Sequence, residues 1–421
     1  MKIEELLVEF QRYGIPEVKR RELVLPLDVR AAVTVTGLRR VGKTYLLYQT
    51  MKYIKEDIGN IFYINFEDER LSDIRSEELS KIVELYKKYN PEAKRMYLFL
   101  DEVQNVPGWE KFVRRILERR DARIFVTGSS SKLLSREIAT ALRGRSVSFN
   151  LLPLSFREFL RFKGFKMRKK YIEDDRGLIM RYLEEYMKFG GFPELVNCEE
   201  FIKLRRLQEY LQLIIYRDLV DRYGIDKTAM MKALIRVVVR NFASRTSVKK
   251  LHSMLLSSGD KLSKNKVYEY FSYLEDTGFV LPIKKFSFSE VEMSRSMPKN
   301  YVVDTAFPTL YGMEDRGRRM ENIVAVELIR RKYYKDPMLN ISYHYTKKGR
   351  EVDFVLSHGL KVEALIQVSY DVEDPYTRKR ELRALEEASE ELRCKNKTVI
   401  TWDYEEEGEV RFVPLWKWLL S

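Results

Sequence analysis

Short apolar runs alternate with helical segments over the first third of the chain. The apolar runs cover residues 31–37, 60–68, 96–103 and 122–130, and each of them ends in polar residues. Buried strands that alternate with helices are typical of a parallel β-sheet covered on both faces. Because ligands collect at the carboxyl ends of the strands in such α/β sheets, the polar residues after each run are the first candidates for a functional site.

The apolar spacing changes after this region and predicts three further parts. Helical segments fill residues 153–225, which we interpret as a helical lid. Residues 226–290 contain three helical segments followed by a strand-like wing, the pattern of a winged helix-turn-helix. Strands and helices mix again in residues 291–421, which predicts a separate α/β domain in addition to the first domain at 1–152.

A glycine-rich segment follows the first apolar run. GLRRVGKT, residues 37–44, matches the GxxxxGK[ST] pattern between a predicted strand and a predicted helix. Backbone N–H groups of such a loop cradle phosphates at the positive end of the helix, while Lys43 would reach the β- and γ-phosphates and Thr44 would bind magnesium. ATP and Mg²⁺ are therefore the predicted cofactors, and the alternative is a glycine turn with a surface lysine. The residues expected to contact the nucleotide are Gly37, Arg39, Arg40, Val41, Gly42, Lys43, Thr44 and Tyr45.

Two adjacent acids end the third apolar run. The sequence YLFLDEVQ places Asp101 and Glu102 at the carboxyl end of a strand. We expect Asp101 to fix the magnesium shell and Glu102 to orient and polarise the attacking water. The alternative is a pair of exposed acids that begin a turn. Another strand end carries polar side chains that would shape the water network or cap the next helix, namely Asn65, Glu67 and Asp68.

Hydroxyl and arginine side chains near the fourth run are further candidates. Thr127 or Ser129 could sense the γ-phosphate or hold the lytic water, or the serines could cap a helix. Arg143 and Arg145 are candidates for an arginine finger that stabilises transition-state charge, either within the subunit or across a subunit interface. Ordinary surface arginines are the alternative for both.

Length and charge narrow the class of protein. The 421 residues exceed what one hydrophobic core usually serves, so we expect about two to four domains. Hydrophobic residues make up 45% of the chain and charged residues 33%, which is too apolar for a disordered chain. The net charge of +14 favours an anionic partner, and nucleic acid is the usual one. A solvated surface rich in Lys, Arg and Glu is the alternative.

Cysteines and histidines are too few for zinc or disulfide chemistry. Cys198 and Cys394 lie far apart, neither belongs to a CxxC pair, and the chain has three histidines. We therefore expect neither structural zinc nor a disulfide. No stretch reaches about 18 uncharged apolar residues, and residues 1–20 mix acids with apolar side chains. These features predict a cytoplasmic protein without a membrane partner.

With these segments together, the chain resembles the prokaryotic, chiefly archaeal, AAA-like P-loop ATPases that are fused to a C-terminal restriction-endonuclease-like domain. The motifs that carry the resemblance are GLRRVGKT, YINFEDERL, FLDEVQNVPGWE, VTGSSSKLL, LRGR, LPLSFREFL, GGFPE, YRDLV, YVVDTAF, ENIVAVEL and EVDFVL. The resemblance implies an AAA-type parallel sheet with a helical lid, a winged helix and a nuclease-like α/β domain. It also implies nucleotide roles for Lys43, Thr44, Asp101 and Glu102, and the finger role for Arg145.

The nuclease-like part departs from its pattern. Nucleases of that architecture bind a metal and activate water with a helix-borne Glu, an Asp on one hairpin strand and an acidic-x-Lys on the next. Glu327 and Asp353 match the first two, but Gln367 and Ser369 stand where the acid and the lysine would be. Glu363 shares a strand face with Gln367 and could replace a ligand, while nothing obvious replaces the lysine. We expect a retained fold that binds nucleic acid or a partner, with active cleavage or purely structural use as alternatives.

The predicted winged helix carries basic residues. Residues 263–279 would form its recognition helix, whose first turn could contact phosphates and base edges. Lysines before it and in the wing would add phosphate contacts. The residues concerned are Lys264, Asn265, Lys266, Tyr268, Lys249, Lys250, Lys284 and Lys285. DNA is the predicted partner, and a protein-docking module with solvated lysines is the alternative.

The leading functional hypothesis is a magnesium-dependent ATPase that works as a switch or motor with DNA. Nucleotide state would change the angle between sheet and lid and so reposition the C-terminal domains. The competing hypothesis is a regulatory or signalling ATPase, antitoxin-like or defence-like, whose C-terminal domains bind a protein. An ATP-regulated nuclease is the third. The predicted partners are ATP or ADP and DNA, with a second copy of the chain or another protein as further options.

Overall fold

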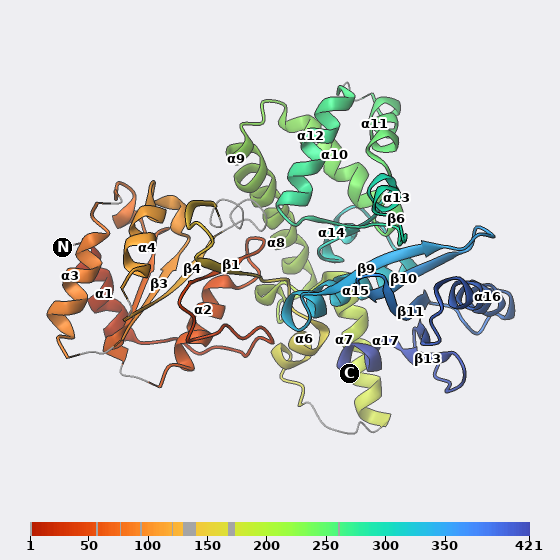
Figure 1. The fold of residues 1–421 in the computed structure, drawn as a ribbon, viewed down its shortest axis with the longest axis horizontal. Helices are drawn as coiled ribbons and strands as arrows, with labels where there is room; N and C mark the ends of the chain where they lie inside the picture. Colours follow the sequence, from red (N-terminus) through yellow and green to blue (C-terminus); the bar gives the residue numbers. More distant parts are fainter. Residues whose placement is uncertain are drawn as a thin grey trace. The chain divides into compact units, whose positions relative to one another are not determined.

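The computed structural model describes residues 2–55, 58–75, 77–92, 95–119, 121–128, 140–166, 173–259 and 262–421. The chain forms two compact units (Figure 1). The first consists of Met1–Leu152 with Asp276–Gly278, and the second of Pro153–Glu275 with Phe279–Ser421. Each unit contains its own hydrophobic core, as expected of parts that fold around separate centres.

The first unit is built on a five-stranded sheet with the order β2-β3-β4-β1-β5. Every neighbouring pair in it is parallel. Its strands are β1 (Ala32–Thr36), β2 (Ile61–Asn65), β3 (Met96–Asp101), β4 (Ala122–Thr127) and β5 (Ser146–Asn150). The first four lie within the four apolar runs, so the predicted parallel α/β sheet is confirmed.

Both faces of the central strands are covered. Alternate side chains of β2, β3 and β4 share one core with helices α1, α3 and α4. Phe99 and Phe125 fall between those positions and stack on the opposite face with ring centroids 4.5 Å apart. Strands β3 and β4 are consequently buried at every position, which explains their uninterrupted apolar sequence. The helices of this unit are α1 (Lys2–Tyr13), α2 (Lys43–Lys52), α3 (Ser80–Tyr89) and α4 (Trp109–Leu117), with 3₁₀ turns at Ile58–Asn60, Glu69–Leu71 and Val103–Asn105.

Strand β5 was not predicted from the sequence. It pairs with β1 from Ala32 opposite Ser146 to Thr36 opposite Asn150 and forms the edge of the sheet. Its sequence SVSFN is half polar and its residues are at least partly exposed, because an edge strand has only one neighbouring strand. A polar strand of this kind lacks the apolar run by which the other four were found.

The second unit begins with helices. They are α6 (Phe156–Phe162), α7 (Glu173–Phe189), α8 (Glu200–Leu213), a π-helix at Ile214–Val220 and α9 (Asp221–Tyr223), with a 3₁₀ turn at Pro193–Leu195. Helix α6 starts with a capping box in which Ser155 and Glu158 each bind the backbone N–H of the other. Within the described ranges of the chain, no helix is long and apolar enough to cross a membrane.

Three helices and a small sheet follow. The helices are α10 (Thr228–Arg240), α11 (Val248–Ser257) and α12 (Lys264–Asp276), and the strands are β6 (Ser244–Arg245), β7 (Val280–Ile283) and β8 (Lys299–Val302). The sheet order is β6-β8-β7, and both strand pairs are antiparallel. Helix α13 (Glu290–Arg295) lies between β7 and β8 in the sequence. The three helices predicted for residues 226–290 are thus present, and their arrangement as a winged helix stays a prediction.

A second five-stranded sheet forms the C-terminal part, with the order β13-β12-β11-β10-β9. Strands β9, β10 and β11 are antiparallel, whereas β11, β12 and β13 are parallel. The strands are β9 (Leu339–Tyr345), β10 (Glu351–His358), β11 (Lys361–Ser369), β12 (Lys397–Thr401) and β13 (Arg411–Pro414). The helices are α14 (Ala306–Leu310), α15 (Arg316–Tyr334), α16 (Pro375–Leu392) and α17 (Leu415–Leu420). Helix α16 packs on this sheet through Ala384, Leu385 and Ala388.

A buried aspartate joins the GGFPE segment to the VVDTAF segment. One carboxylate oxygen of Asp304 accepts a hydrogen bond from the backbone N–H of Gly191 at 2.8 Å, and the other accepts from the N–H of Ala306 at 2.8 Å. Gly190 has φ +70°, and a Cβ on it would lie 1.6 Å from Asp304 Oδ1. Burial raises the pKa of Asp304 to about 6. The two motifs therefore meet at a structural contact that requires a glycine.

Candidate functional site

The loop after β1 is shaped by close packing against the end of β5. A Cβ on Gly37 would lie 2.3 Å from the carbonyl oxygen of Leu151, and Gly37 has φ +146°, so only glycine fits there. The backbone N–H of Leu151 donates to the carbonyl of Thr36 at 2.7 Å. Gly42, in a left-handed conformation, precedes helix α2, whose first turn presents its N–H groups toward the loop.

Lys43 lies folded across this loop. Its side chain is buried, and Nζ donates to the carbonyl oxygens of Gly37 at 3.3 Å and Leu38 at 3.2 Å. Nζ also lies 3.5 Å from Oε1 of Glu102. These partners hold an ammonium group at the helix N-terminus, where an anion is already favoured.

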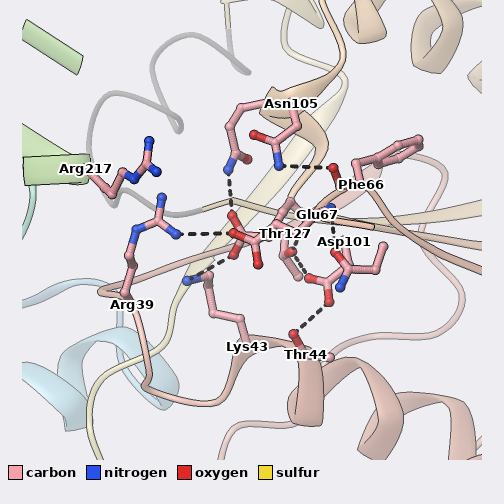
Figure 2. A network of polar contacts seen from close by, with 12 residues as sticks. Arg39, Lys43, Thr44, Phe66, Glu67, Asp101, Asn105, Thr127 and Arg217 are labelled. Atoms are coloured by element: carbon pink, nitrogen blue, oxygen red, sulfur yellow. Dashed lines mark hydrogen bonds and ion pairs between the residues drawn. The ribbon is translucent and has the colours of Figure 1, made fainter. Parts of the chain in front are cut away.

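Asp101 lies at the end of β3 in a set of hydroxyl donors (Figure 2). Its Oδ2 accepts hydrogen bonds from Thr44 Oγ1 at 2.7 Å and from the hydroxyl of Tyr63 at 3.0 Å, while its Oδ1 accepts from Thr127 Oγ1. Burial raises the pKa of Asp101, and the hydrogen bonds from Thr127 and Thr44 oppose that shift. A hydroxyl and a carboxylate in contact at a helix N-terminus are the oxygen ligands that Mg²⁺ uses beside phosphates.

Glu102 follows with a left-handed backbone conformation, φ 52°. Its N–H donates to Thr127 Oγ1 at 2.9 Å, and its Oε2 accepts from Gln104 Nε2 at 2.6 Å. Burial opposes ionisation, but the charge of Lys43 and the hydrogen bond from Gln104 outweigh it and hold the pKa of Glu102 below its ordinary value. An ionised carboxylate in a dry site can accept a hydrogen bond from water and polarise it.

The strand order explains why these side chains meet. Strand β4 lies between β1 and β3, so Thr127 at its end reaches the residues that end β3. Of the two hydroxyls singled out in this segment, Thr127 joins the network, and Ser129 lies outside the described residues. The third strand end, that of β2, contributes Asn65 Oδ1, which accepts from the N–H of Glu67 at 2.9 Å.

Arg39 extends the site from the loop side. Its NH1 lies 3.3 Å from Oε1 of Glu67, as Figure 2 shows. Asp68, next in sequence, caps the short 3₁₀ turn that follows β2 by accepting from the N–H of Arg70. Tyr45 is 53% exposed and packs edge-on against Tyr48 at 5.7 Å.

Arg143 and Arg145 do not join this cluster. They directly precede β5, and Ser146 pairs with Ala32 at the beginning of β1, whereas the glycine loop follows the end of β1. The two arginines therefore lie near the beginning of β1 and the loop lies at its end, and this length of strand is roughly 13 Å. NH1 of Arg145 lies 3.6 Å from Oε1 of Glu118. A finger role for Arg145 therefore requires that it reach the loop of a second copy of the chain.

Sequence reasoning missed three residues that support the site. The guanidinium of Arg21 is buried, and it donates to the carbonyl of Val41 in the loop at 2.7 Å and to that of Leu152 at 2.8 Å. Tyr63 could have been found, because it shares a strand face with Asn65 at the carboxyl end of β2. Gln104 follows the acid pair closely, but no sequence signal separates it from other turn residues, and Arg21 lies in no motif.

Comparisons with known proteins agree with this geometry. The model of a family described as an AAA domain matches residues 29–160. The "Uncharacterized protein MJ1544" of Methanocaldococcus jannaschii is 37% identical over 419 residues, covering 96% of this chain and 92% of that protein. This chain belongs to the family of that archaeal protein. Its first unit contains an AAA-type P-loop ATPase domain, which carries the glycine loop and the acid pair.

Further relatives of this AAA family member are more distant. An "Uncharacterized protein" of Haemophilus influenzae is 27% identical over 360 residues, covering 84% of this chain and 86% of that protein. Among solved structures, the Walker-type ATPase paby2304 of Pyrococcus abyssi is similar with a TM-score of 0.45 and 13% identity, covering 73% of this chain and 94% of that one. Two families described as domains of unknown function match residues 180–314 (DUF8612) and 316–418 (DUF4143).

In the C-terminal part of this AAA protein, two expected nuclease residues lie elsewhere. Glu327 does not meet Asp353, because its carboxylate pairs with Arg330 at 3.0 Å and with Arg331 at 3.2 Å. The helical glutamate beside Asp353 is Glu321, six residues earlier and so about 240° around helix α15. Glu363 does not replace a ligand either, since it pairs with His358 at 3.1 Å near the β10–β11 turn.

The basic residues near the three-helix segment are mostly solvent-facing. Lys264 and Lys266 open helix α12, and Lys266 pairs with Glu269 at 2.9 Å. Tyr268 is 50% exposed, with Nζ of Lys264 lying 5.9 Å from its ring centroid. Lys249 and Lys250 occupy the first turn of helix α11, and Lys284 and Lys285 follow β7.

Proposed function

We propose that this protein binds ATP with Mg²⁺ in the loop at residues 37–44 and hydrolyses it. The single observation that carries the proposal is the contact between Thr44 Oγ1 and Asp101 Oδ2 at 2.7 Å, beside the ammonium of Lys43. A lysine, a hydroxyl and a carboxylate at one helix N-terminus are what a magnesium–triphosphate complex needs. The AAA-domain match over residues 29–160 supports the same conclusion.

The roles follow from the contacts. Loop N–H groups and Lys43 bind the phosphates, and Lys43 exchanges its long contacts with loop carbonyls for phosphate oxygens. Thr44 and Asp101 would hold the metal, which would supply positive charge near the transferred phosphoryl group. Glu102 accepts a hydrogen bond from the attacking water and orients it. Thr127 positions both acids, since it donates to Asp101 and accepts from the N–H of Glu102.

The test is nucleotide binding and turnover by the full chain, with and without Mg²⁺. We expect the wild-type protein to release phosphate from ATP only when Mg²⁺ is present. Lys43→Ala should weaken binding of a fluorescent ATP analogue, because the loop then lacks the ammonium that is expected to reach the β- and γ-phosphates. Wild-type protein that neither retains nor hydrolyses any nucleoside triphosphate with Mg²⁺ would overturn the proposal.

We further propose that nucleotide state controls action on DNA. In this proposal residues 153–225 are the lid, 226–290 a winged helix and 291–421 a degenerate nuclease-like domain, and Arg145 acts as a finger on a second copy. The net charge of +14 and the lysines that open α11 and α12 support DNA as the partner. We expect duplex or single-stranded DNA to stimulate ATP hydrolysis, and the stimulation to fall steeply with salt. An ATPase rate indifferent to DNA at low salt would contradict this.

A regulatory ATPase that binds a protein is the second candidate. The observation that favours it is the apolar surface next to the wing, where Phe288 and Val291 are 59% and 58% exposed. Exposed apolar side chains of this size mark docking surfaces more often than phosphate-contacting ones. This candidate predicts ATP hydrolysis that does not respond to DNA and responds to a protein partner.

A further inference from the structure

A hollow of about 610 Å³ opens beside the second sheet, and five acidic side chains line it together with Arg350 and Arg380. The carboxylates come from helix α15, strand β10, the segment after β11 and helix α16. They belong to Glu321, Glu351, Asp353, Asp371 and Glu381. This is the place where the nuclease pattern would hold its metal, since Asp353 and Gln367 both line it.

The ammonium group of Lys299 lies between three of these carboxylates. Its side chain is buried, and Nζ lies 2.6 Å from Glu321 Oε1, 2.5 Å from Glu351 Oε1 and 2.9 Å from Asp353 Oδ1. An ammonium group has three N–H donors, so three carboxylates satisfy it completely. Lys299 comes from strand β8 of the small sheet, 54 residues before Asp353, and so belongs to none of the motif positions.

Each of the three carboxylates also accepts a hydrogen bond from a second donor. Tyr301 donates its hydroxyl to Glu321 at 2.6 Å, and Tyr345 donates to Glu351 at 2.6 Å. The second oxygen of Asp353 accepts from the backbone N–H of Val368 at 3.0 Å. Glu351 also lies 3.4 Å from Nε of Arg245. The three acids are therefore fixed around the ammonium by further donors, most of them neutral.

With Lys299 in place, the pocket does not fit a divalent metal. Gln367 brings no charge, and its amide is fully engaged: Oε1 accepts from the N–H of Asp353 at 3.2 Å, and Nε2 donates to Glu381 at 2.6 Å. Among the residues that the structure describes, no group of three or more His, Cys, Asp or Glu side chains is arranged to hold a metal ion. An ammonium in contact with Asp353 would also repel a dication bound to the same carboxylate.

We propose that Lys299 is the resident cation of this pocket, and that its ammonium takes the place between Glu321, Glu351 and Asp353 that a divalent metal would take. The pocket consequently excludes Mg²⁺ and Mn²⁺, and the C-terminal part does not cleave nucleic acid by a metal-dependent route. Burial opposes the charge of Lys299, but the charge of Asp353 and of the other acids keeps its pKa well above the ordinary value, so the cation is permanent.

Lys299 also connects two sheets. It joins strand β8 of the small sheet to helix α15 and strand β10 of the larger sheet, all within the second unit. A metal in the same place would join only groups that can give it oxygen ligands. With a lysine in the position that a metal would occupy, the pocket forms a structural contact between two sheets.

The experiment is Mn²⁺ binding by the full chain without nucleotide, followed by electron paramagnetic resonance of free Mn²⁺ and by thermal melting. The wild-type protein and its Asp353→Asn variant should bind Mn²⁺ alike, because the pocket contributes nothing. Lys299→Met should open the pocket, bind Mn²⁺ about tenfold tighter or more once the repulsion is removed, and melt higher with Mn²⁺ than without. The gain should disappear in Lys299→Met with Asp353→Asn.

Two results would overturn the proposal: wild-type Mn²⁺ binding that Asp353→Asn abolishes, or no gain of Mn²⁺ binding in a folded Lys299→Met protein. If Lys299→Met does not fold, Lys299→Met with Glu321→Gln removes one charge of each sign and keeps two carboxylates, and the same criteria apply to it. Binding of the fluorescent ATP analogue is measured on every variant. Since it reports on the loop at residues 37–44, the proposed ATPase can fail or hold independently of this result.

Discussion

Each unit buries a lysine beside acidic side chains, which are Glu102 in the first unit and Glu321, Glu351 and Asp353 in the second. The aspartates of the two clusters, however, have different partners. Asp101 accepts hydrogen bonds from the hydroxyls of Thr44, Tyr63 and Thr127, all neutral donors. Asp353 instead contacts the ammonium of Lys299 directly. A carboxylate held by neutral donors can still attract an incoming cation, whereas the charge of one paired with a lysine is already neutralised.

The two lysines differ in the same sense. Lys43 makes contacts of 3.2 to 3.5 Å to two loop carbonyls and one carboxylate, which are long enough to exchange for a better acceptor. Lys299 makes contacts of 2.5 to 2.9 Å to three carboxylates. The comparison teaches that the same residue types make an open site or a closed one, depending on which partner carries the neutralising charge.

The largest expected effect separates the acids of the two clusters by turnover. Glu102→Gln should lower ATP hydrolysis by about 10²- to 10⁴-fold, because the amide cannot accept the proton of the attacking water. Binding of a fluorescent ATP analogue should stay near wild type. Glu351→Gln is the matched change in the second unit and should leave turnover unchanged. If Glu102→Gln lost binding as completely as Lys43→Ala does, the division of roles would be wrong.

The next effect separates the two lysines by stability. Lys299→Met should destabilise the second unit by about 3–5 kcal/mol, because it leaves buried carboxylates without their counter-charge. Lys43→Met should cost about 1 kcal/mol, since two of its partners are neutral carbonyls. Hydrogen exchange of peptides from β10 and from β3 measures each unit separately. Equal losses of protection in the two variants would erase the distinction drawn between the clusters.

A smaller effect tests the neutral donors around Asp101. Thr127→Val should destabilise the first unit by about 1–3 kcal/mol, because Asp101 Oδ1 and the N–H of Glu102 both lose a partner in a buried place. Thr127→Ser keeps the hydroxyl and should recover most of the loss. Urea unfolding followed by hydrogen exchange of β3 is the measurement. A valine variant as stable as the serine variant would show that the hydroxyl does not support the acids.

The smallest expected effect concerns Tyr63. Tyr63→Phe removes one of three donors to Asp101, so the cost should be about 0.5–1.5 kcal/mol. We expect Tyr63→Phe to need a several-fold higher Mg²⁺ concentration for half-maximal ATP hydrolysis, with little change in nucleotide affinity. Tyr89→Phe, which removes a hydroxyl that donates to Glu4 at 2.6 Å and not to Asp101, is the control and should have no effect on the Mg²⁺ requirement. An unchanged requirement in Tyr63→Phe would show that the Tyr63 hydroxyl does not support Asp101 as a metal ligand.

The features of the first unit that the sequence predicted are the ones formed by residues close together in the chain. Strands β1 to β4 appear as apolar runs because both faces are covered, and the loop at 37–44 is contiguous. The acid pair follows its strand directly. Strand β5 was missed because an exposed edge strand does not need an apolar run, and Arg21 because its partners lie 20 and 131 residues away.

The acidic cluster of the second unit was harder to predict from the sequence, because its residues are far apart in the chain. Motif spacing suggested Glu327 as the helical acid, but only the phase of helix α15 around its axis decides that Glu321 faces Asp353. Lys299 lies on another sheet, and nothing in the residues around it marks it as a partner of β10. Long-range pairing of charged groups leaves little trace in local sequence, whereas periodic burial leaves a clear one.

Arg21 has a practical consequence for work on the isolated ATPase domain. The AAA match begins at residue 29, and a protein cut there would lack the guanidinium that binds the carbonyls of Val41 and Leu152. It would also lack the contacts of Gln49 with the backbone of Arg21 and Leu23. A truncated protein trimmed to the family boundary would therefore carry the glycine loop and the acid pair but have a less well supported loop, so a weak ATPase rate from it would say little about the intact chain.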